Sequence, residues 1–504
     1  MNYRLSFVVT IQLLLGSSTN PAFGEGAVET AIDVAMEDAI GRYNIRGASI
    51  AYYDGNTMEA PLVRGYGQLS SAADSDAVDG STVFMIASVS KVFTGVAVSA
   101  LLDSGTIELD DDICDTLAGL DFATSACRNP HAADAKVTWR MLVTHRSSMA
   151  GSLPFAKNAN GDTVEAAYAP VGAYEGGIAV GNPSCPLEDT LSFYRDYLTN
   201  TQTTTVGGDV DWYALAQNDG GAWKKEAPGD ASEYSNAAFG YLAPLIALEA
   251  GMTFPDFSKE RIFDKLGMKN TAWFRRDLPQ TGVAEAIPNL YSAKTDAFTD
   301  LPGPDGGHYC FVDYASGSLH TSAEDLAKFG KAMLDYGVGT LFEKESTGKA
   351  ATECQERDSA GAEVSECEYG VAWNRLYNGM PYSPASLCNL KDADWTDGVS
   401  HNGGEAGSQT LLFVLPKAKT FAVVLTSTSG NSEEASDMLM NDLLAAANGG
   451  AKEGCTYSGS GSGSGPGPGE KDSAVVNNSA TSPAGTFSMV STCIIVGAAY
   501  GMFL

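Results

Sequence analysis

The sequence predicts an α/β protein whose sheet is assembled from both ends of the chain, with a mostly helical segment between them. Strand-like runs gather near residues 48–66 and 410–426, whereas the middle, from about 85 to 300, carries more helical patterning. Apolar residues make up 44% of the 504 positions, which is enough for a large buried core. This composition argues against wholesale disorder and against a protein with several membrane spans.

The predicted elements can be justified in chain order. The first is an amphipathic helix, because Ile32, Met36 and Ala39 recur at helical spacing. The later helices end at turn-forming residues, as at Asn448-Gly449. The remaining elements are strands at 48–53 and 62–66, separated by the turn Asp54-Gly55-Asn56, helices at 92–102 and 237–250, strands at 410–415 and 420–426, and a helix at about 433–447.

The charge balance narrows the choice of partners. Lys and Arg number 31 against 62 Asp and Glu, which gives a formal net charge of −31. Binding of nucleic acid needs clustered basic residues, so no nucleic-acid partner is expected. The same acidity argues against docking on an anionic membrane through basic residues.

Both chain ends carry targeting patterns. Residues 1–24 have a basic start, an apolar run and a small-residue end, which is typical of a secretory signal peptide; a buried N-terminal helix is the alternative. Residues 456–486 form a Gly/Ser/Pro-rich linker. The apolar tail 487–504 is expected to be a GPI signal or a single membrane span, so the protein would be extracellular or on the cell surface.

The cysteine count agrees with export. Of nine cysteines, Cys493 lies in the tail, and the even number that remains suggests disulfides. Cys114 with Cys127 and Cys354 with Cys367 would form plausible local loops, although the sequence alone cannot fix the pairing. A zinc site is the weaker reading, because no two of these cysteines have C-x-x-C spacing.

One motif suggests nucleophilic chemistry. No H-E-x-x-H, G-x-S-x-G or Walker sequence occurs, but Ser88-Val89-Ser90-Lys91 opens a predicted helix after an apolar lead-in. Three-residue spacing places Ser88 and Lys91 one turn apart, and a lysine whose pKa is lowered by burial can take a proton from a serine. Ser346 and Lys349 have the same spacing and are expected in a surface loop. A chance pair on a solvated helix face is the alternative for Ser88 and Lys91.

Two further motifs give the first one a context. Tyr234-Ser235-Asn236 lies in the middle of the chain, and His401-Asn402-Gly403-Gly404 precedes a strand. With the S-x-x-K sequence, this order resembles the serine β-lactamase-related hydrolases over about residues 27–447. The resemblance implies a class C β-lactamase-like α/β (α+β) fold, with an antiparallel sheet flanked by helices plus a mostly helical domain. The hydrolase domain would span 27–455, its α/β part being about 27–84 and 300–455 and its helical part about 85–299.

The resemblance implies roles for the first two motifs. Ser88 would be the nucleophile and Lys91 its partner in proton transfer. Tyr234 would be a second general base or acid, its pKa lowered by two nearby cationic groups. Asn236 would position the substrate and accept a hydrogen bond from the Lys91 ammonium group.

It also implies roles for the third motif. His401, Asn402 and Gly403 would bind the substrate, and the backbone N–H groups of Ser88 and Gly404 would form the oxyanion hole. The substrate would be a small ester or amide, and neither a cofactor nor a metal is implied. A catalytically inactive surface protein that keeps the fold for binding is the alternative.

The sequence departs from the family pattern in two places. β-Lactamases usually have Lys where His401 stands, and a neutral histidine attracts carboxylates less, so neutral or cationic esters and amides are expected as substrates, with at most weak β-lactamase activity. The family's T-H-x-S-G segment loses its glycine at Ser148, which is expected to reshape a loop. His145, His308 and His320 are read as structural, because no metal-ligand spacing links them.

Overall fold

The computed structural model describes most of the region that is expected to fold. It covers residues 25–451 except 123–125, 150, 152–154, 158–162, 166–189, 200–221, 280, 302–307, 309–312, 377–388, 391–395 and 430–434. The expected signal peptide, linker and C-terminal tail lie outside the described residues.

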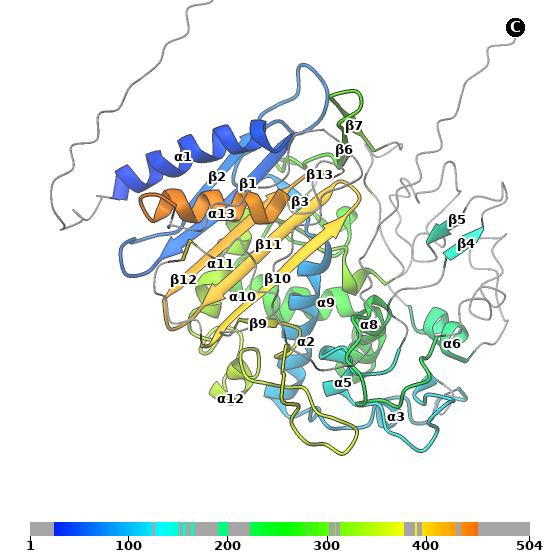
Figure 1. The fold of residues 1–504 in the computed structure, drawn as a ribbon. Helices are drawn as coiled ribbons and strands as arrows, with labels where there is room; N and C mark the ends of the chain where they lie inside the picture. The colour runs from blue at the N-terminus through cyan, green and yellow to red at the C-terminus, as the bar shows by residue number, and fades with distance from the viewer. Residues whose placement is uncertain are drawn as a thin grey trace, which may run out of the picture.

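A six-stranded sheet forms the centre of the α/β part. Its strand order is β2-β1-β12-β11-β10-β9, and every neighbouring pair is antiparallel. The first two strands come from the N-terminal end and the other four from the C-terminal end, which confirms the predicted assembly (Figure 1). The strands are β1 (Gly47–Asp54), β2 (Leu62–Gly67), β9 (Asn374–Leu376), β10 (Gly398–Glu405), β11 (Ser408–Leu415) and β12 (Thr420–Thr426).

Helices cover both faces of this sheet. On one face lie α1 (Glu25–Arg42) and α13 (Ala435–Ala447), side by side (Figure 1). Alternate residues of β11, such as Leu411, pack with them, whereas Leu412 packs with the larger helical core. Because both faces are covered, β11 and β12 are buried along their whole length and read as almost continuous apolar runs.

The mostly helical part lies on the other face. Its helix α2 (Ser90–Ser104) is buried over most of its length and ends at Gly105, whose φ of +73° favours glycine. The Ser346–Lys349 segment, expected in a loop, instead forms a short helix that begins at Glu345. The other helices are α3 (Ile113–Thr116), α5 (Trp139–Val143), α6 (Leu191–Thr199), α8 (Asn236–Ala250), α9 (Phe254–Ser258), α10 (Asp264–Leu266), α11 (Ala323–Met333) and α12 (Glu345–Lys349), with short turns η1 (Ala87–Val89), η3 (Lys259–Phe263), η4 (Arg275–Asp277) and η5 (Tyr314–Ser316).

Small sheets connect these parts. The pair β3-β8 leads into the S-x-x-K segment, and a parallel contact joins β13 to β6. Within the described residues no single helix is long and apolar enough to cross a membrane, and α8 with the segment 254–266 meets that test only jointly, across a 79° bend. The strands are β3 (Val83–Met85), β8 (His320–Ser322), β4 (Phe155–Lys157), β5 (Thr163–Glu165), β6 (Asn289–Ser292), β7 (Ala297–Asp300) and β13 (Thr428–Ser429).

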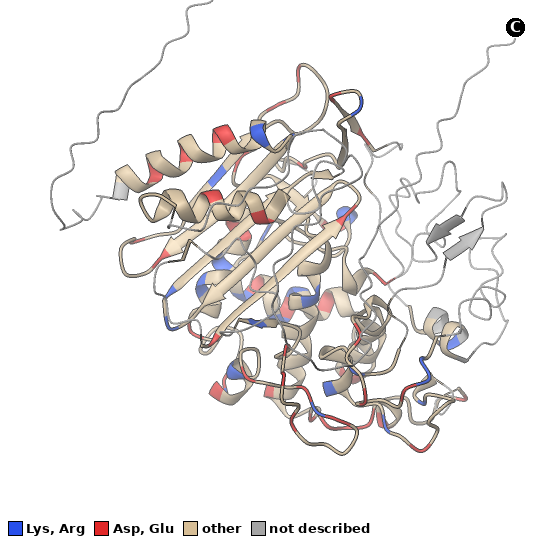
Figure 2. Ribbon diagram, in the orientation of Figure 1, with Lys and Arg blue, Asp and Glu red and all other residues tan. Residues whose placement is uncertain are grey.

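Two local disulfides are present. Cys114 is bonded to Cys127 and Cys354 to Cys367, which confirms the two expected pairs. Acidic residues, red in Figure 2, occur in many of the described elements and at several positions along α1, in keeping with the net charge of −31.

Candidate active site

The segment that carries Ser88 is held in a sharp turn against the sheet. Ser88 lies in η1, one residue after Ala87, whose φ of +47° is the left-handed conformation that non-glycine residues rarely adopt. The Thr410 hydroxyl of β11 donates a hydrogen bond of 2.8 Å to the carbonyl oxygen of Ile86. The sheet therefore fixes the backbone immediately before the serine, and η1 runs directly into α2.

Lys91 contacts Ser88 from the first turn of α2. Its side chain is fully buried, and Nζ donates hydrogen bonds to Ser88 Oγ at 3.2 Å and to the Ser316 carbonyl oxygen at 2.7 Å. Burial lowers the pKa of Lys91 to about 7, although the charges of Asp313 and Glu405 oppose this shift. Near neutral pH a large share of this amine is therefore uncharged and able to accept the Ser88 proton.

Tyr234 completes the group around the serine. Its side chain is hydrogen-bonded with Ser88, and its ring centroid lies 4.8 Å from Lys91 Nζ. The expectation that cationic neighbours lower its pKa is wrong. Burial raises the pKa of Tyr234, and the Glu405 charge adds to the increase. The cationic form of Lys91 is itself disfavoured, so Tyr234 keeps its proton and is suited to act as an acid.

Asn236 lies beside the site as the first residue of α8, but it does not make the implied contact. Among the described residues its Oδ1 is buried without a hydrogen-bond partner, so the bond from Lys91 is absent. The reason is that Lys91 Nζ is directed to Ser88 and to the Ser316 carbonyl. A buried acceptor without a partner is a group that a bound donor could satisfy.

Strand β10 brings the third motif next to the serine. A side chain at Gly403 would place its Cβ 2.9 Å from Ser88 N and 2.5 Å from Thr410 Oγ1, so only glycine allows this approach. Asn402 and Gly404 alternate with it and are exposed. The predicted oxyanion residues, Ser88 and Gly404, are thus carried by two segments in direct contact.

His401 is buried on the same strand, two residues before Gly403. Its Nδ1 lies 2.6 Å from the carbonyl oxygen of Asn402. A carbonyl oxygen can only accept, so Nδ1 carries the hydrogen and Nε2 is left as an acceptor. Burial, together with the charge on Lys91, lowers the pKa of His401 to about 3, so the ring is neutral, as the sequence predicts.

Sequence reasoning did not find the contact that His145 makes with this site. His145 Nδ1 accepts a hydrogen bond of 2.9 Å from Ser235 N, and its ring centroid lies 4.4 Å from that of Tyr234. The Tyr369 ring packs against the imidazole in a T-shaped arrangement, with the two ring centroids 4.9 Å apart. His145 therefore packs against the ring of Tyr234. Its position in the T-H-x-S-G segment could have suggested a role near the site. His308 lies elsewhere, with Nε2 3.8 Å from Glu285 Oε2.

Ser148 occupies the position where the family has glycine. Its φ of +64° is the left-handed conformation that glycine adopts at little cost and other residues rarely adopt. The hydroxyl donates to the Glu226 carbonyl and accepts a 2.8 Å hydrogen bond from Asn129 Nδ2. These bonds offset the strain of the left-handed conformation at Ser148.

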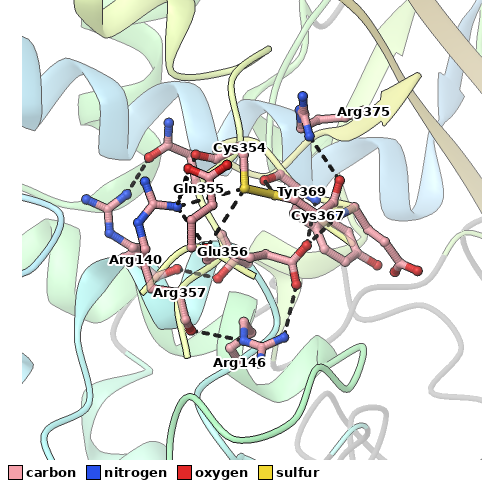
Figure 3. Close-up of a disulfide and its surroundings, with 12 residues drawn as sticks. Arg140, Arg146, Cys354, Gln355, Glu356, Arg357, Cys367, Tyr369 and Arg375 are labelled. Carbon is pink, nitrogen blue, oxygen red and sulfur yellow. Dashed lines mark hydrogen bonds and ion pairs between the residues drawn. A yellow bond between two sulfur atoms is a disulfide. The ribbon is translucent and has the colours of Figure 1, made fainter. Parts of the chain in front are cut away.

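Buried polar contacts join the Cys354–Cys367 loop to Arg146, the residue that follows His145 (Figure 3). Arg146 Nη1 lies 3.2 Å from Glu356 Oε1, and the Glu356 side chain is only 1% exposed. The other Glu356 oxygen accepts the backbone N–H of Tyr369 at 3.1 Å. The loop thereby fixes the tyrosine that packs on His145.

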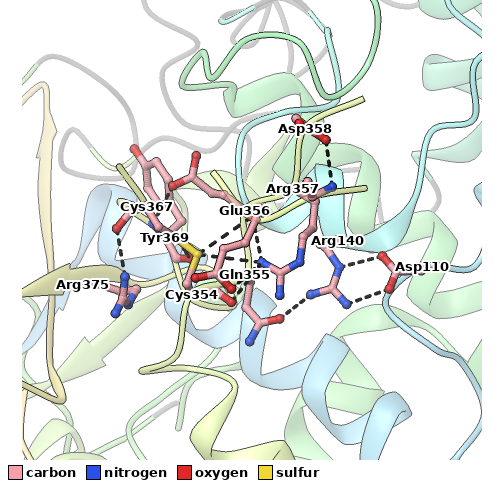
Figure 4. A network of polar contacts seen from close by, with 12 residues as sticks. Asp110, Arg140, Cys354, Gln355, Glu356, Arg357, Asp358, Cys367, Tyr369 and Arg375 are labelled. Carbon is pink, nitrogen blue, oxygen red and sulfur yellow. Dashed lines mark hydrogen bonds and ion pairs between the residues drawn. A yellow bond between two sulfur atoms is a disulfide. The ribbon is translucent and has the colours of Figure 1, made fainter. Parts of the chain in front are cut away.

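A second set of contacts holds the same loop to α5. Arg140 binds both carboxylate oxygens of Asp110 and also contacts the side-chain oxygen of Gln355 (Figure 4).

In the described part of the chain, no group of His, Cys, Asp and Glu side chains could hold a metal ion.

Comparisons with known proteins agree with this geometry. The family model described as β-lactamase matches residues 28–447. The chain is similar to penicillin-binding protein 4 of Amycolatopsis lactamdurans, with 22% identity over 76% of this chain and 81% of that protein. Among solved structures, a class C β-lactamase has a TM-score of 0.56 at 15% identity, covering 83% of this chain and 96% of that chain. The D-amino acid amidase of Ochrobactrum anthropi SV3 has a TM-score of 0.54 at 17% identity, covering 83% and 98%. The chain belongs to the β-lactamase family of serine hydrolases.

Proposed function

We propose that Ser88 attacks the carbonyl carbon of a small ester or amide and forms an acyl-enzyme, which water then hydrolyses. The observation that carries this proposal is the 3.2 Å contact between Ser88 Oγ and a fully buried Lys91 amine. Lys91 takes the Ser88 proton as the oxygen bonds to the carbonyl carbon. Tyr234, which keeps its own proton, donates to the departing alcohol or amine.

The developing negative charge needs donors close to Ser88. The backbone N–H groups of Ser88 and Gly404 supply them, and a donor of this kind is typically worth about 3 kcal/mol in the transition state. In the second half of the reaction, water takes the place of the leaving group. Tyr234, which lost its proton to the leaving group, then accepts the proton of the attacking water, and Lys91 returns to Ser88 the proton that it took in the first half.

The substrate class follows from the charge of the site. Among the described groups, the negative charges that act on Lys91 are those of Asp313 and Glu405. His401 is neutral and presents an acceptor at Nε2, which suits an N–H donor and disfavours a carboxylate. Neutral or cationic esters and amides are therefore the expected substrates. The names of the similar proteins, which include an amidase and a D-alanyl-D-alanine carboxypeptidase, agree with amide chemistry.

A substrate screen tests the proposal. The wild type and Ser88→Ala are compared on p-nitrophenyl esters, D-amino-acid amides and a chromogenic cephalosporin. Turnover of esters or amides that is lost in Ser88→Ala is expected, with slow or absent cephalosporin hydrolysis. His401→Lys should raise kcat/KM for carboxylate-bearing substrates relative to neutral ones. Without any Ser88-dependent turnover or labelling, the protein would be an inactive relative that binds.

We also propose that the protein is exported and held at the cell surface by its C-terminal tail. The signal-like residues 1–24, the apolar run 487–504 and the two disulfides support this location. Treatment of the producing cells with a phosphatidylinositol-specific phospholipase should release the protein. Retention in the membrane would indicate a single span, and an intracellular soluble protein would contradict the proposal.

A further inference from the structure

A buried carboxyl group lies next to the turn that Lys91 contacts. Asp313 is 3% exposed and immediately precedes the turn η5. Within this turn, Ser316 makes two contacts: its carbonyl oxygen accepts from Lys91 Nζ at 2.7 Å, and its hydroxyl donates to Asp313 Oδ2 at 3.2 Å. Thr94, one helical turn after Lys91, donates to the Ala315 carbonyl oxygen at 2.7 Å. The turn is thus fastened to α2 at the level of the lysine.

The carboxyl group is incompletely satisfied by hydrogen bonds. Among the described residues, Asp313 Oδ1 is buried and has no partner. A buried carboxylate is costly unless a positive charge compensates for it. Burial raises the pKa of Asp313, and the charge of Lys91 opposes this increase. Each of these two buried groups therefore favours the charged form of the other.

Other titratable groups also face this pair. Toward Lys91 they are Glu405 and His401 from β10, Tyr234 before α8, and His145 after α5. Toward Asp313 the further group is Tyr194 of α6. Glu405 is the other acid acting on Lys91, but it is partly exposed and therefore more strongly screened by water than Asp313.

We propose that Asp313 is a positioning residue for the Ser88 reaction. Its carboxyl group interacts electrostatically with the buried amine of Lys91 and thereby sets the pH range in which this amine can accept the Ser88 proton. The proposal rests on the proposed acyl-enzyme function. Ser316 connects the two groups, because its carbonyl oxygen accepts a hydrogen bond from Lys91 Nζ and its hydroxyl donates one to the Asp313 carboxyl group. A merely structural Asp313 would affect folding without changing the pH dependence of acylation.

The test is the pH profile of kcat/KM for p-nitrophenyl acetate between about pH 5 and pH 9, with the Ser88→Ala rate subtracted. Asp313→Asn removes the negative charge, so the neutral amine should persist to lower pH. The acidic limb should then move down by about one pH unit. Asp325→Asn is the matched control. Asp325 is 1% exposed, but it is bound by Lys328 at 2.7 Å and should leave the limb in place.

A second variant covers the case in which Asp313→Asn does not fold. Ser316→Ala keeps the carbonyl contact to Lys91 but removes the hydroxyl that stabilises the carboxylate, so a smaller shift in the same direction is expected. The proposal would be overturned if the acidic limb of the kcat/KM profile stays in place in a variant that folds and only the plateau of the profile is lower. Absence of Ser88-dependent turnover in the wild type would instead overturn the proposed function, and this inference with it.

Discussion

Replacing Glu356 with Gln should destabilise the protein strongly, although the two side chains have nearly the same shape. One carboxylate oxygen lies 3.2 Å from Arg146 Nη1, and the other accepts the backbone N–H groups of Glu368 and Tyr369. An amide must place its NH2 group at one of these two positions. In either orientation a donor therefore faces a donor.

The size of the effect follows from burial. Arg146 and Glu356 are 9% and 1% exposed, so water cannot replace the lost interaction. Removing one partner of a buried ion pair leaves an uncompensated charge and costs about 3–5 kcal/mol. This range includes the loss of the hydrogen bonds that the backbone N–H groups of Glu368 and Tyr369 donate to Glu356. We therefore expect Glu356→Gln to lower the free energy of unfolding by about 3–5 kcal/mol.

Urea unfolding followed by tryptophan fluorescence measures this change. The matched control is Glu345→Gln on α12, where Glu345 and Lys349 form an ion pair with 68% and 39% of their side chains exposed. This control should not change the unfolding midpoint measurably. A loss below about 1 kcal/mol for Glu356→Gln, at an unchanged m value, would refute the reasoning.

Four further outcomes are expected. Because the neutral amine of Lys91 is the base and its pKa is about 7, kcat/KM should fall about tenfold per pH unit below that value and level off above it; a flat profile would contradict this. The free energy of unfolding should also rise with pH from about 7 toward the ordinary lysine value of 10.5, since the unfolded chain binds the extra proton; urea titrations across this range would detect it. Tyr234→Phe keeps the ring packing but removes the acid, so kcat/KM should fall about 10²–10⁴-fold in steady-state assays with unchanged circular dichroism. Replacing Cys354 and Cys367 together with Ser opens a loop with a sequence separation of 13 and should cost about 3 kcal/mol in urea unfolding, and an unchanged midpoint would contradict this.

The sequence was sufficient to predict the architecture because its signals are local. Apolar strand runs at both ends and helical periodicity between them reflect which faces are buried, and β12 begins and ends where the pattern places it, at Thr420 and Thr426. The pairing of Ser88 with Lys91 was predictable from their three-residue spacing on a helix, whereas the place of Tyr234 beside them was predicted from the resemblance to the family.

Other features of the site depend on tertiary packing and could not be predicted. The raised pKa of Tyr234 comes from burial by distant segments, and the free Oδ1 of Asn236 comes from competition by a carbonyl. Ser316 acts on Lys91 through its backbone, so its residue type carries no signal. Asp313 resembles any other acidic residue in a chain with 62 of them until its burial is known.

The most direct test of the account is covalent labelling with a serine-directed fluorophosphonate, read by intact mass and peptide mapping. The wild type should gain one adduct, on Ser88, at a rate that rises with pH through about 7. Ser88→Ala should gain none, and Lys91→Met should react far more slowly. An adduct on another residue, or equal labelling of Ser88→Ala, would contradict the assignment of Ser88 as the nucleophile.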